Sequence, residues 1–252
     1  MPRMALHPLA EQFGSIAEVY ERGRPEYAPA VVGALAAELG LAPGARVLDL
    51  AAGTGKLSRA LLAAGFDVIA VEPQASLRDL LAGKVGADRA LAGVAEQIPL
   101  ADGAVDAATV ADAFHWFDQA AALADIRRVL RPGGGLALLS TVPDWSGASW
   151  AHELGTLIMN ARPAHPHFDG PSWREAIRAA GGWSEPREIR VTTNQTAGPA
   201  RIVDYVASMS WVAALRDEQR TAMLERVAAL VETGDSPSEL PLHIVIGLAQ
   251  LA

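Results

Sequence analysis

The stretch VLDLAAGTGKLSRALLAAG, residues 47–65, constrains the fold of this chain more than any other. Its apolar start predicts a buried strand over 46–50, and the residues after the loop predict a helix over 56–64 that Gly65 ends. The loop between them holds Gly53 and Gly55, which allow positive φ and let a ligand approach without a Cβ in the way. This order of elements is typical of a ligand site at the carboxyl edge of a parallel sheet.

Apolar strands continue to alternate with helices as far as residue 142. Further strands are predicted at 67–71, 89–92, 105–110, 136–142, 188–193 and 242–248, with helices at 75–81 and 119–130 among them. Mostly apolar strands separated by helices imply a parallel sheet with both faces covered. Right-handed crossovers then give a doubly wound, mainly parallel α/β fold of about seven strands.

The 252 residues are expected to form a single domain. Residues 8–40 are expected to form N-terminal cap helices, 41–142 the ligand-binding core, 143–182 a helical lid over the sheet edge, and 183–252 the strands and helices that complete the sheet.

Composition excludes several classes of function. The formal net charge is −8, from 21 Lys and Arg against 29 Asp and Glu, and a nucleic-acid partner would need a basic face. Without cysteine there is no disulfide, thiolate metal site or cysteine nucleophile. His165-Pro166-His167 lacks the spacing of a metal site, so no metal is expected. No apolar run is long enough to span a membrane and no leader is evident, which predicts a cytoplasmic protein.

The glycine loop departs from two common nucleotide-binding patterns. In a phosphate loop a hydroxyl residue would follow Lys56, but Leu57 stands there. In a dinucleotide loop a third glycine would stand at Ser58. Asp49 would also repel a pyrophosphate, whereas a carboxylate there suits a cation. These observations argue against a phosphate-bearing nucleotide as the ligand of this loop.

Glu72 is the second acid of this region. It ends the strand at 67–71, 17 residues after Gly55, where an acidic residue can accept both ribose hydroxyls. If Asp49 lies near an amino group and Glu72 binds a ribose, the ligand that fits both is a nucleoside that carries an amino acid. The alternative for Asp49 is that it bonds the loop without touching a ligand.

Several motifs in register resemble those of class I S-adenosylmethionine-dependent methyltransferases. VLDLAAGTGKL is similar to motif I, with Ala51 where many members have glycine, and AVEP at 70–73 resembles the second motif. Residues 93–118 resemble the stretch around the fourth strand, and 130–140 the turn into the fifth. FGSIAEVYERGRPEY at 13–27 is similar to the start of the trans-aconitate methyltransferase-like branch of type 11 enzymes.

The resemblance implies S-adenosylmethionine as cofactor and S-adenosylhomocysteine as product. It assigns cofactor contacts to Tyr20, Arg24, Asp49, Ala51, Gly53, Gly55, Glu72, Pro73, Ala95, Glu96 and Ala111. Arg24 and Tyr20 would close over the cofactor, and Arg24 could pair with a carboxylate of cofactor or substrate. Many relatives have aspartate at the position of Val94, so the adenine contact differs here.

Methyl transfer by in-line displacement needs a general base only when the acceptor is a hydroxyl or a protonated amine. His115, after the fourth strand, is the candidate base; the alternative is a histidine packed in a turn. His115 is also predicted to line the substrate pocket, together with Trp116, Trp145 and Trp150, since small-molecule sites are largely apolar. The alternative is that the tryptophans of the lid form its core.

The sequence therefore predicts an enzyme that methylates a small molecule on oxygen, and a carboxylate acceptor follows from the trans-aconitate resemblance. It is expected to act as a monomer or homodimer without nucleic acid or membrane. The alternatives are a methyltransferase acting on RNA or protein, a non-catalytic protein that binds S-adenosylmethionine or another ligand, and a nicotinamide oxidoreductase.

Overall fold

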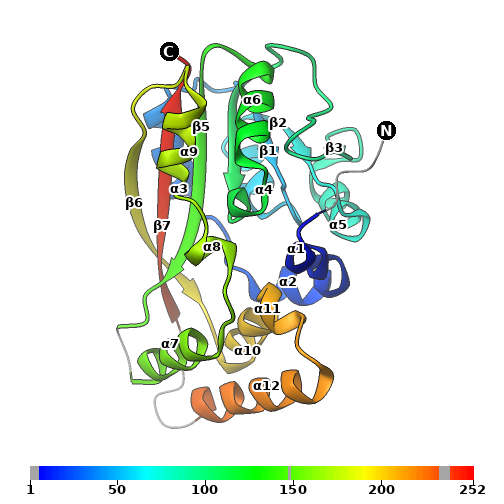
Figure 1. The fold of residues 1–252 in the computed structure, drawn as a ribbon, viewed down its shortest axis with the longest axis vertical. Helices are drawn as coiled ribbons and strands as arrows, with labels where there is room; N and C mark the ends of the chain where they lie inside the picture. The colour runs from blue at the N-terminus through cyan, green and yellow to red at the C-terminus, as the bar shows by residue number, and fades with distance from the viewer. Residues whose placement is uncertain (1–5, 147–148, 233–238) are drawn as a thin grey trace.

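A computed structural model describes residues 6–146, 149–232 and 239–252. Its centre is a seven-stranded sheet of order β3-β2-β1-β4-β5-β7-β6 (Figure 1). The strands are β1 (Arg46–Leu50), β2 (Asp67–Val71), β3 (Ala90–Leu91), β4 (Val105–Ala111), β5 (Leu130–Pro143), β6 (Arg187–Thr196) and β7 (Glu239–Gln250). The first five strands pair in parallel and β7 is antiparallel to β5 and β6. This confirms the expected doubly wound, mainly parallel sheet.

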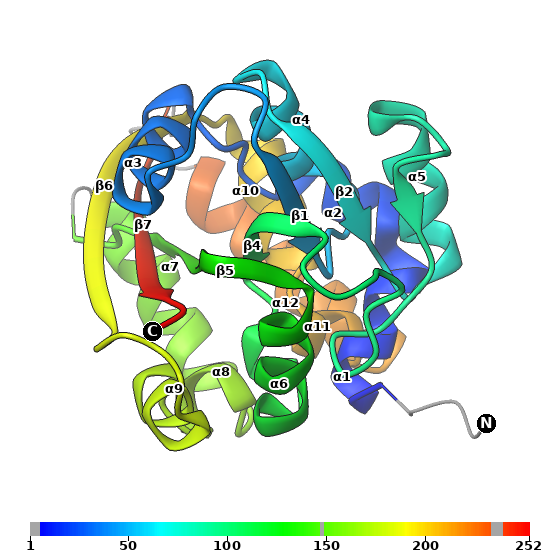
Figure 2. The same ribbon diagram turned by 90° about the horizontal axis from the view of Figure 1, so that it is seen from above.

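Helices cover both faces of the sheet (Figure 2). On one face lie α3 (Pro29–Leu39), α4 (Lys56–Ala63) and α5 (Ala75–Val85), and on the other lie α6 (Gln119–Val129) and α9 (Trp173–Ala180). Successive strand residues point to opposite faces: Val47 packs with the α3–α4 cluster and Leu48 with the α6–α9 cluster. Both side chains are fully buried, which is why β1 reads as a continuous apolar run.

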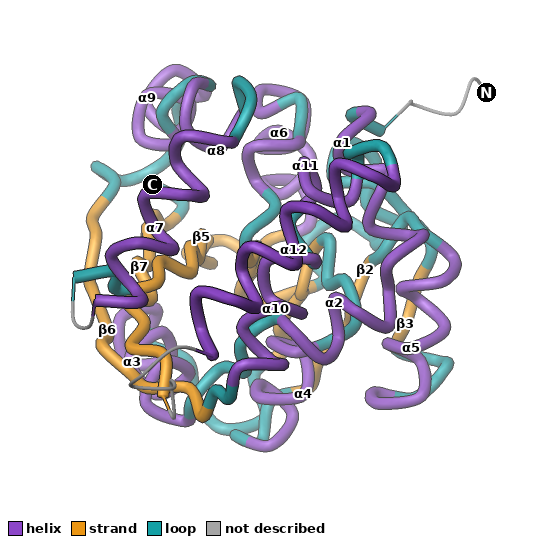
Figure 3. Tube along the Cα trace, turned by 90° about the horizontal axis from the view of Figure 1, so that it is seen from below, coloured by secondary structure: helices purple, strands orange, loops and turns teal. Residues whose placement is uncertain are grey.

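A third layer of helices lies beyond the carboxyl ends of the parallel strands, and Figure 3 shows it from below. It contains α1 (Pro8–Glu11), the 3₁₀ helix η1 (Gln12–Ile16), α2 (Ala17–Gly23), α7 (Ser149–Ala161), α10 (Pro199–Ala207), α11 (Ser210–Ala213) and α12 (Asp217–Glu232). Gly23 permits the close contact of α2 with α10, since a Cβ there would lie 2.4 Å from the backbone of Asp204. The N-terminal helices are thereby fixed over the edge where a ligand is expected.

The stretch 143–182, expected as one lid, lies in separate places. Helix α7 packs in the helical layer, where Trp150 and Leu154 join Tyr205 and Val227 in an apolar cluster. The short helix α8 (Pro166–Asp169) contacts the 3₁₀ helix η2 (Phe114–Trp116), which follows β4. Helix α9 returns to the sheet face beside α6. Among the described residues, no helix has both the length and the apolar character needed to cross a bilayer.

Substitution of Gly55 tests how tightly the loop is built. Gly55 has φ +85° and a Cβ there would lie 2.6 Å from Cδ1 of the fully buried Leu81; Gly65 has φ +86° with nothing within 4 Å. We expect Gly65→Ala to cost ~1–2 kcal/mol of unfolding free energy through backbone strain alone. Gly55→Ala should cost a further ~1–3 kcal/mol, because its methyl group overpacks the core. Urea denaturation measures both, and equal losses would contradict the tight contact with Leu81.

Candidate active site

Two residues with unusual backbone conformations mark the carboxyl edge of the sheet. Ala51 after β1 has φ +54° and Asp112 after β4 has φ +52°, the two non-glycine residues with positive φ in the described chain. Strands β1 and β4 are direct neighbours, so the two residues follow adjacent strand ends. Such conformations cost ~1–3 kcal/mol each and cluster at binding and catalytic sites. A glycine at position 51 would avoid this cost.

Glu72 joins the end of β2 to the glycine loop. One carboxylate oxygen accepts a hydrogen bond from the N–H of Gly53 at 2.9 Å, and the other accepts from the N–H of Gln74 at 2.9 Å. Burial raises the pKa of Glu72 to about 7, against the opposing effect of these two bonds. The carboxylate is thus fixed in place while its residue still lines the main cavity.

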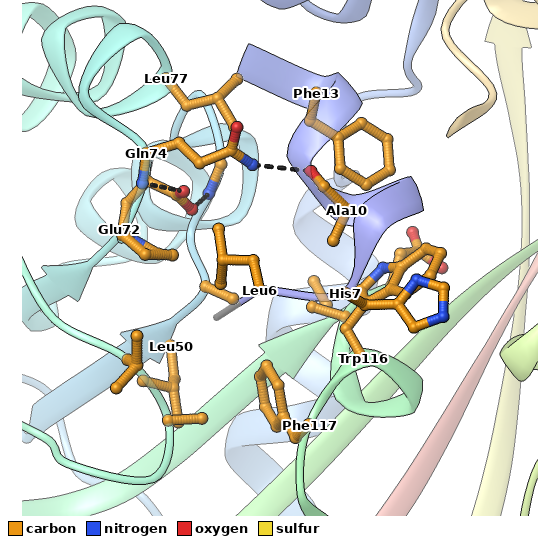
Figure 4. Close-up of a pocket in the computed structure, with 18 of the residues that line it drawn as sticks. Leu6, His7, Ala10, Phe13, Leu50, Glu72, Gln74, Leu77, Trp116 and Phe117 are labelled. Carbon is orange, nitrogen blue, oxygen red and sulfur yellow. Dashed lines mark hydrogen bonds between the residues drawn. The ribbon is translucent and has the colours of Figure 1, made fainter. Parts of the chain in front are cut away.

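The main cavity encloses about 940 Å³, its open mouth included, above the ends of β1, β2 and β4 (Figure 4). Its walls are mostly apolar, with Glu72 as the buried acid among them. Among the predicted site residues it is lined by Tyr20, Arg24, Ala51, Gly53, Glu72, Pro73, Ala95, Glu96, Ala111 and Trp116. The structure therefore brings most of the predicted cofactor contacts to one cavity.

A smaller, more polar cavity of about 420 Å³ adjoins it. The two share Tyr20, Arg24, Ala51, Ala111 and Asp112. Asp49 lines the smaller cavity, buried at the end of β1. The hydroxyl of Ser58 donates to Asp49 at 2.5 Å, and burial raises the pKa of this carboxyl group to about 6. Gly55 lines neither cavity: it is the N-cap of α4, and a Cβ on it would point toward Leu81.

Arg24 lies where the two cavities meet. One Nη donates to the carbonyl of Ser208 at 3.1 Å, and its guanidinium lies 5.3 Å from the ring centroid of Tyr20 and 5.5 Å from that of Tyr205. Its Nε is buried without a hydrogen-bond partner, and no described carboxylate lies within ion-pair distance. A cation in such a position is costly unless an anion pairs with it.

The N-terminal helices are clamped to the core by a network of ion pairs. Lys84 of α5 lies 2.6 Å from Glu21, and Lys56 at the start of α4 lies 2.6 Å from Glu26 and 3.8 Å from Glu21. Gln74 adds a hydrogen bond to the carbonyl of Ala10 at 2.8 Å. The chain has only these two lysines, and both hold the segment that carries Tyr20 and Arg24.

His115 lies beside the main cavity rather than in its lining. Its ring packs against Trp116 at 4.5 Å and His167 at 4.9 Å between centroids. Burial, reinforced by neighbouring imidazoles and Arg24, lowers the pKa of His115 to about 2. A base this weak is poorly matched to proton abstraction at neutral pH.

Of the three tryptophans predicted to line the pocket, the structure places one at the cavity and two elsewhere. Trp116 lines the main cavity, whereas Trp145 and Trp150 belong to the apolar cluster of the helical layer and line neither cavity. Trp145 packs against α7, 2.8 Å from where a Cβ on Gly155 would lie, and its ring is 6.3 Å from that of Tyr205. The placement of these two rings matches the alternative of lid core, because the amphipathic helix α7 must bury its apolar face.

Sequence reasoning missed several residues of the cavity walls. His7, Phe13, Gln74 and Phe117 line the main cavity, and Asp112 lines both. Asp112 accepts hydrogen bonds from the N–H of Thr141 at 2.8 Å and the hydroxyl of Tyr27 at 3.3 Å. Its position directly after β4 was the available signal, since strand ends of this sheet form the site.

Comparison with known proteins agrees with this arrangement. Residues 48–138 match the family model described as a methyltransferase domain. The chain is 38% identical over 221 residues to an uncharacterised methyltransferase of Mycobacterium tuberculosis, covering 88% of this chain and 86% of that protein. The chain belongs to the class I methyltransferases.

Two further similarities place this methyltransferase. A solved structure called a putative type II methyltransferase from Anaeromyxobacter dehalogenans has a TM-score of 0.64 at 24% identity, covering 90% of this chain and 97% of that one, which shows the shared fold. Malonyl-[acyl-carrier protein] O-methyltransferase of Pectobacterium atrosepticum is 35% identical over 131 residues, about half of each chain. The oxidoreductase alternative has no support in these matches.

Proposed function

We propose that this methyltransferase uses S-adenosylmethionine to methylate a carboxylate oxygen of a small molecule. The observation that carries the cofactor part is Glu72, a fixed and buried carboxylate at the end of β2 in a largely apolar cavity. A carboxylate there suits ribose hydroxyls, and the apolar walls suit an adenine ring. When bound, S-adenosylmethionine supplies a methyl group activated by a positively charged sulfur.

The polar cavity fits the amino-acid end of the same cofactor. Its lining combines Arg24, which lacks an anion, with the carboxylates of Asp49 and Asp112. A zwitterion needs both signs of charge within a few ångströms, and this cavity offers both. The residues of this chain hold the ligand, orient it and exclude water from the reacting groups, which is most of what methyl transfer requires of an enzyme.

The character of His115 supports a carboxylate acceptor. A hydroxyl or ammonium acceptor needs a base that removes a proton, and the nearby His115 has its pKa lowered to about 2. A carboxylate is already deprotonated at neutral pH and needs no base. A relative that is similar over about half of each chain is named a malonyl-[acyl-carrier protein] O-methyltransferase, which is consistent with transfer to oxygen.

The role of Glu72 is tested by removing its charge. Glu72→Gln keeps the shape of the side chain, and we expect it to weaken S-adenosylhomocysteine binding ~10–100-fold, since hydrogen bonds to charged groups contribute ~1.5–3 kcal/mol each. In the wild type, affinity should rise with pH through about 7, because ribose hydroxyls favour the ionised carboxylate. Calorimetry across pH measures both effects. The carboxamide also turns an N–H toward the N–H of Gly53 or Gln74, so an analogue without ribose hydroxyls measures the loss that comes through the loop. The natural ligand should lose more affinity than this analogue, and equal losses would place Glu72 away from the ribose.

A second variant identifies the carboxylate that pairs with Arg24. Arg24→Gln removes the cation, and we expect the ligand that carries this carboxylate to bind ~10-fold or more weakly, because charge-assisted hydrogen bonds are the stronger ones. If the partner is on the cofactor, binding of S-adenosylhomocysteine falls while that of its decarboxylated analogue does not. If the partner is on the acceptor, cofactor binding is kept and the KM for the acceptor rises. No change in either quantity would show that Arg24 has a structural role only.

The acceptor class is tested by a screen for S-adenosylhomocysteine formation. The panel should contain small di- and tricarboxylates, matched alcohols and amines, a short RNA and an unfolded protein. We expect turnover with carboxylates and the appearance of their methyl esters by mass spectrometry. Turnover with amines or with macromolecules alone would overturn the acceptor proposal. Binding of S-adenosylhomocysteine without turnover of any member would favour a non-catalytic binding protein.

A further inference from the structure

Four histidines gather around Trp116, at the junction of three chain segments. The ring of Trp116 lies 5.0 Å from His7 of the N-terminal segment and 4.9 Å from His165, which precedes α8. His115 lies 5.6 Å from His165 and 4.9 Å from His167. Trp116 and His7 both line the main cavity. Among the described residues no group of three or more potential ligands is arranged to hold a metal ion.

Two of these histidines are N-caps, each of a different helix, and both use the ring nitrogen Nδ1. Nδ1 of His7 accepts a hydrogen bond from the N–H of Leu9 at the start of α1, at 3.2 Å. Nδ1 of His165 accepts from the N–H of His167 at the start of α8, also at 3.2 Å. An imidazole nitrogen accepts only while it carries no proton. Both caps therefore require neutral rings with the proton on Nε2, and Nε2 of His165 lies 3.1 Å from the Ser210 hydroxyl.

The surroundings of His165 disfavour a positive charge on its ring. His165 is buried, faces His7, His167 and Arg162, and has only Asp169 as an opposing acid. Burial, reinforced by the neighbouring imidazoles, lowers the pKa of His165 to about 4.

The remaining groups around the cluster carry mixed charge. His115 faces the other three histidines and Arg24. His167 faces Arg24, Arg162 and Asp112, and partial burial of its ring lowers its pKa as well. Helix α11, which packs against α1, has no ionisable side chain among Ser210, Trp211, Val212 and Ala213.

We propose that α8, which meets α1 at Trp116, forms an acid-sensitive gate of the main cavity, closed while His165 is a neutral cap and opened when it takes up a proton. Protonation replaces the accepting nitrogen of His165 by an N–H that faces the N–H of His167, so the cap becomes a repulsive contact. It also places a cation beside Arg162 in a half-buried cluster. Release of α8 frees one side of Trp116, a wall of the cavity. That this gate controls access of S-adenosylmethionine rests on the proposed function; its opening does not.

The lowered pKa of His165 determines how the stability of the closed state depends on pH. In an open segment a histidine has a pKa near 6.5, whereas His165 in the closed structure has its pKa lowered to about 4. The closed state thus keeps its full stability above pH ~6.5 and loses it progressively as pH falls toward ~4. At pH 5 the closed-to-open ratio from this one group is reduced by up to about 30-fold.

The gate is tested in the apo protein by hydrogen–deuterium exchange of residues 163–170. After correction for intrinsic exchange, we expect protection of this segment to fall by up to about 30-fold from pH 7.5 to pH 5, with β1 unchanged. The variant His165→Asn keeps an accepting side-chain oxygen, since asparagine is a favoured N-cap, but has nothing to protonate there. Its protection should be nearly independent of pH. Equal pH dependence in both proteins, or none in the wild type, would overturn the proposal.

Two measurements guard against a variant that fails to fold. Nitrogen NMR of the wild-type histidine rings at pH 7.5 should find His165 protonated on Nε2 alone; protonation of its Nδ1 would contradict the cap directly. S-adenosylhomocysteine affinity across pH then separates the two proposals. Titration of Glu72 contributes equally to the wild type and to His165→Asn, so the gate is the difference between them. A gate seen by exchange without cofactor binding would refute the proposed function and leave the gate standing.

Discussion

The tie between Glu72 and the glycine loop is the constraint on which the rest of the site depends. The loop leaves β1 through Ala51 in a left-handed conformation, which a free chain would rarely adopt. The N–H of Gly53 then donates to the Glu72 carboxylate, so the end of β2 supports the turn that leaves β1. The acid thus has a structural task at the same atoms that we propose for binding the ribose. Its raised pKa reflects the cost of burying the charge.

Above this edge, the N-terminal helices form the second half of the site. They contribute Tyr20 and Arg24 to both cavities and are attached to α4 and α5 by ion pairs of Glu21 and Glu26. The protein as a whole carries a formal charge of −8, so an anionic ligand is attracted by local cations against the overall field. Arg24, without a counter-ion of its own, is the local charge placed to do this.

The parts of the molecule that sequence reasoning could predict are those set by short-range pattern. The parallel strands are buried on both faces and so appear as apolar runs, and Glu72 follows from strand position and spacing. Long-range packing decided the rest. Trp145 and Trp150 carry no mark that distinguishes a pocket wall from a helix core, and only the position of α10 and α12 draws them into the latter. The histidine cluster likewise depends on long-range packing, because the segments of His7 and His165 meet at Trp116.

The ion pairs of α2 also determine which surface chemistry the protein can tolerate. Every positive side chain other than Lys56 and Lys84 is an arginine or a histidine, and these two amines are 6% and 19% exposed inside the clamp. Acetylation or amine-directed labelling of a lysine can therefore occur only at the attachment between the N-terminal helices and the core. Such a modification would remove a charge from the ion pairs that attach the segment covering the cavities.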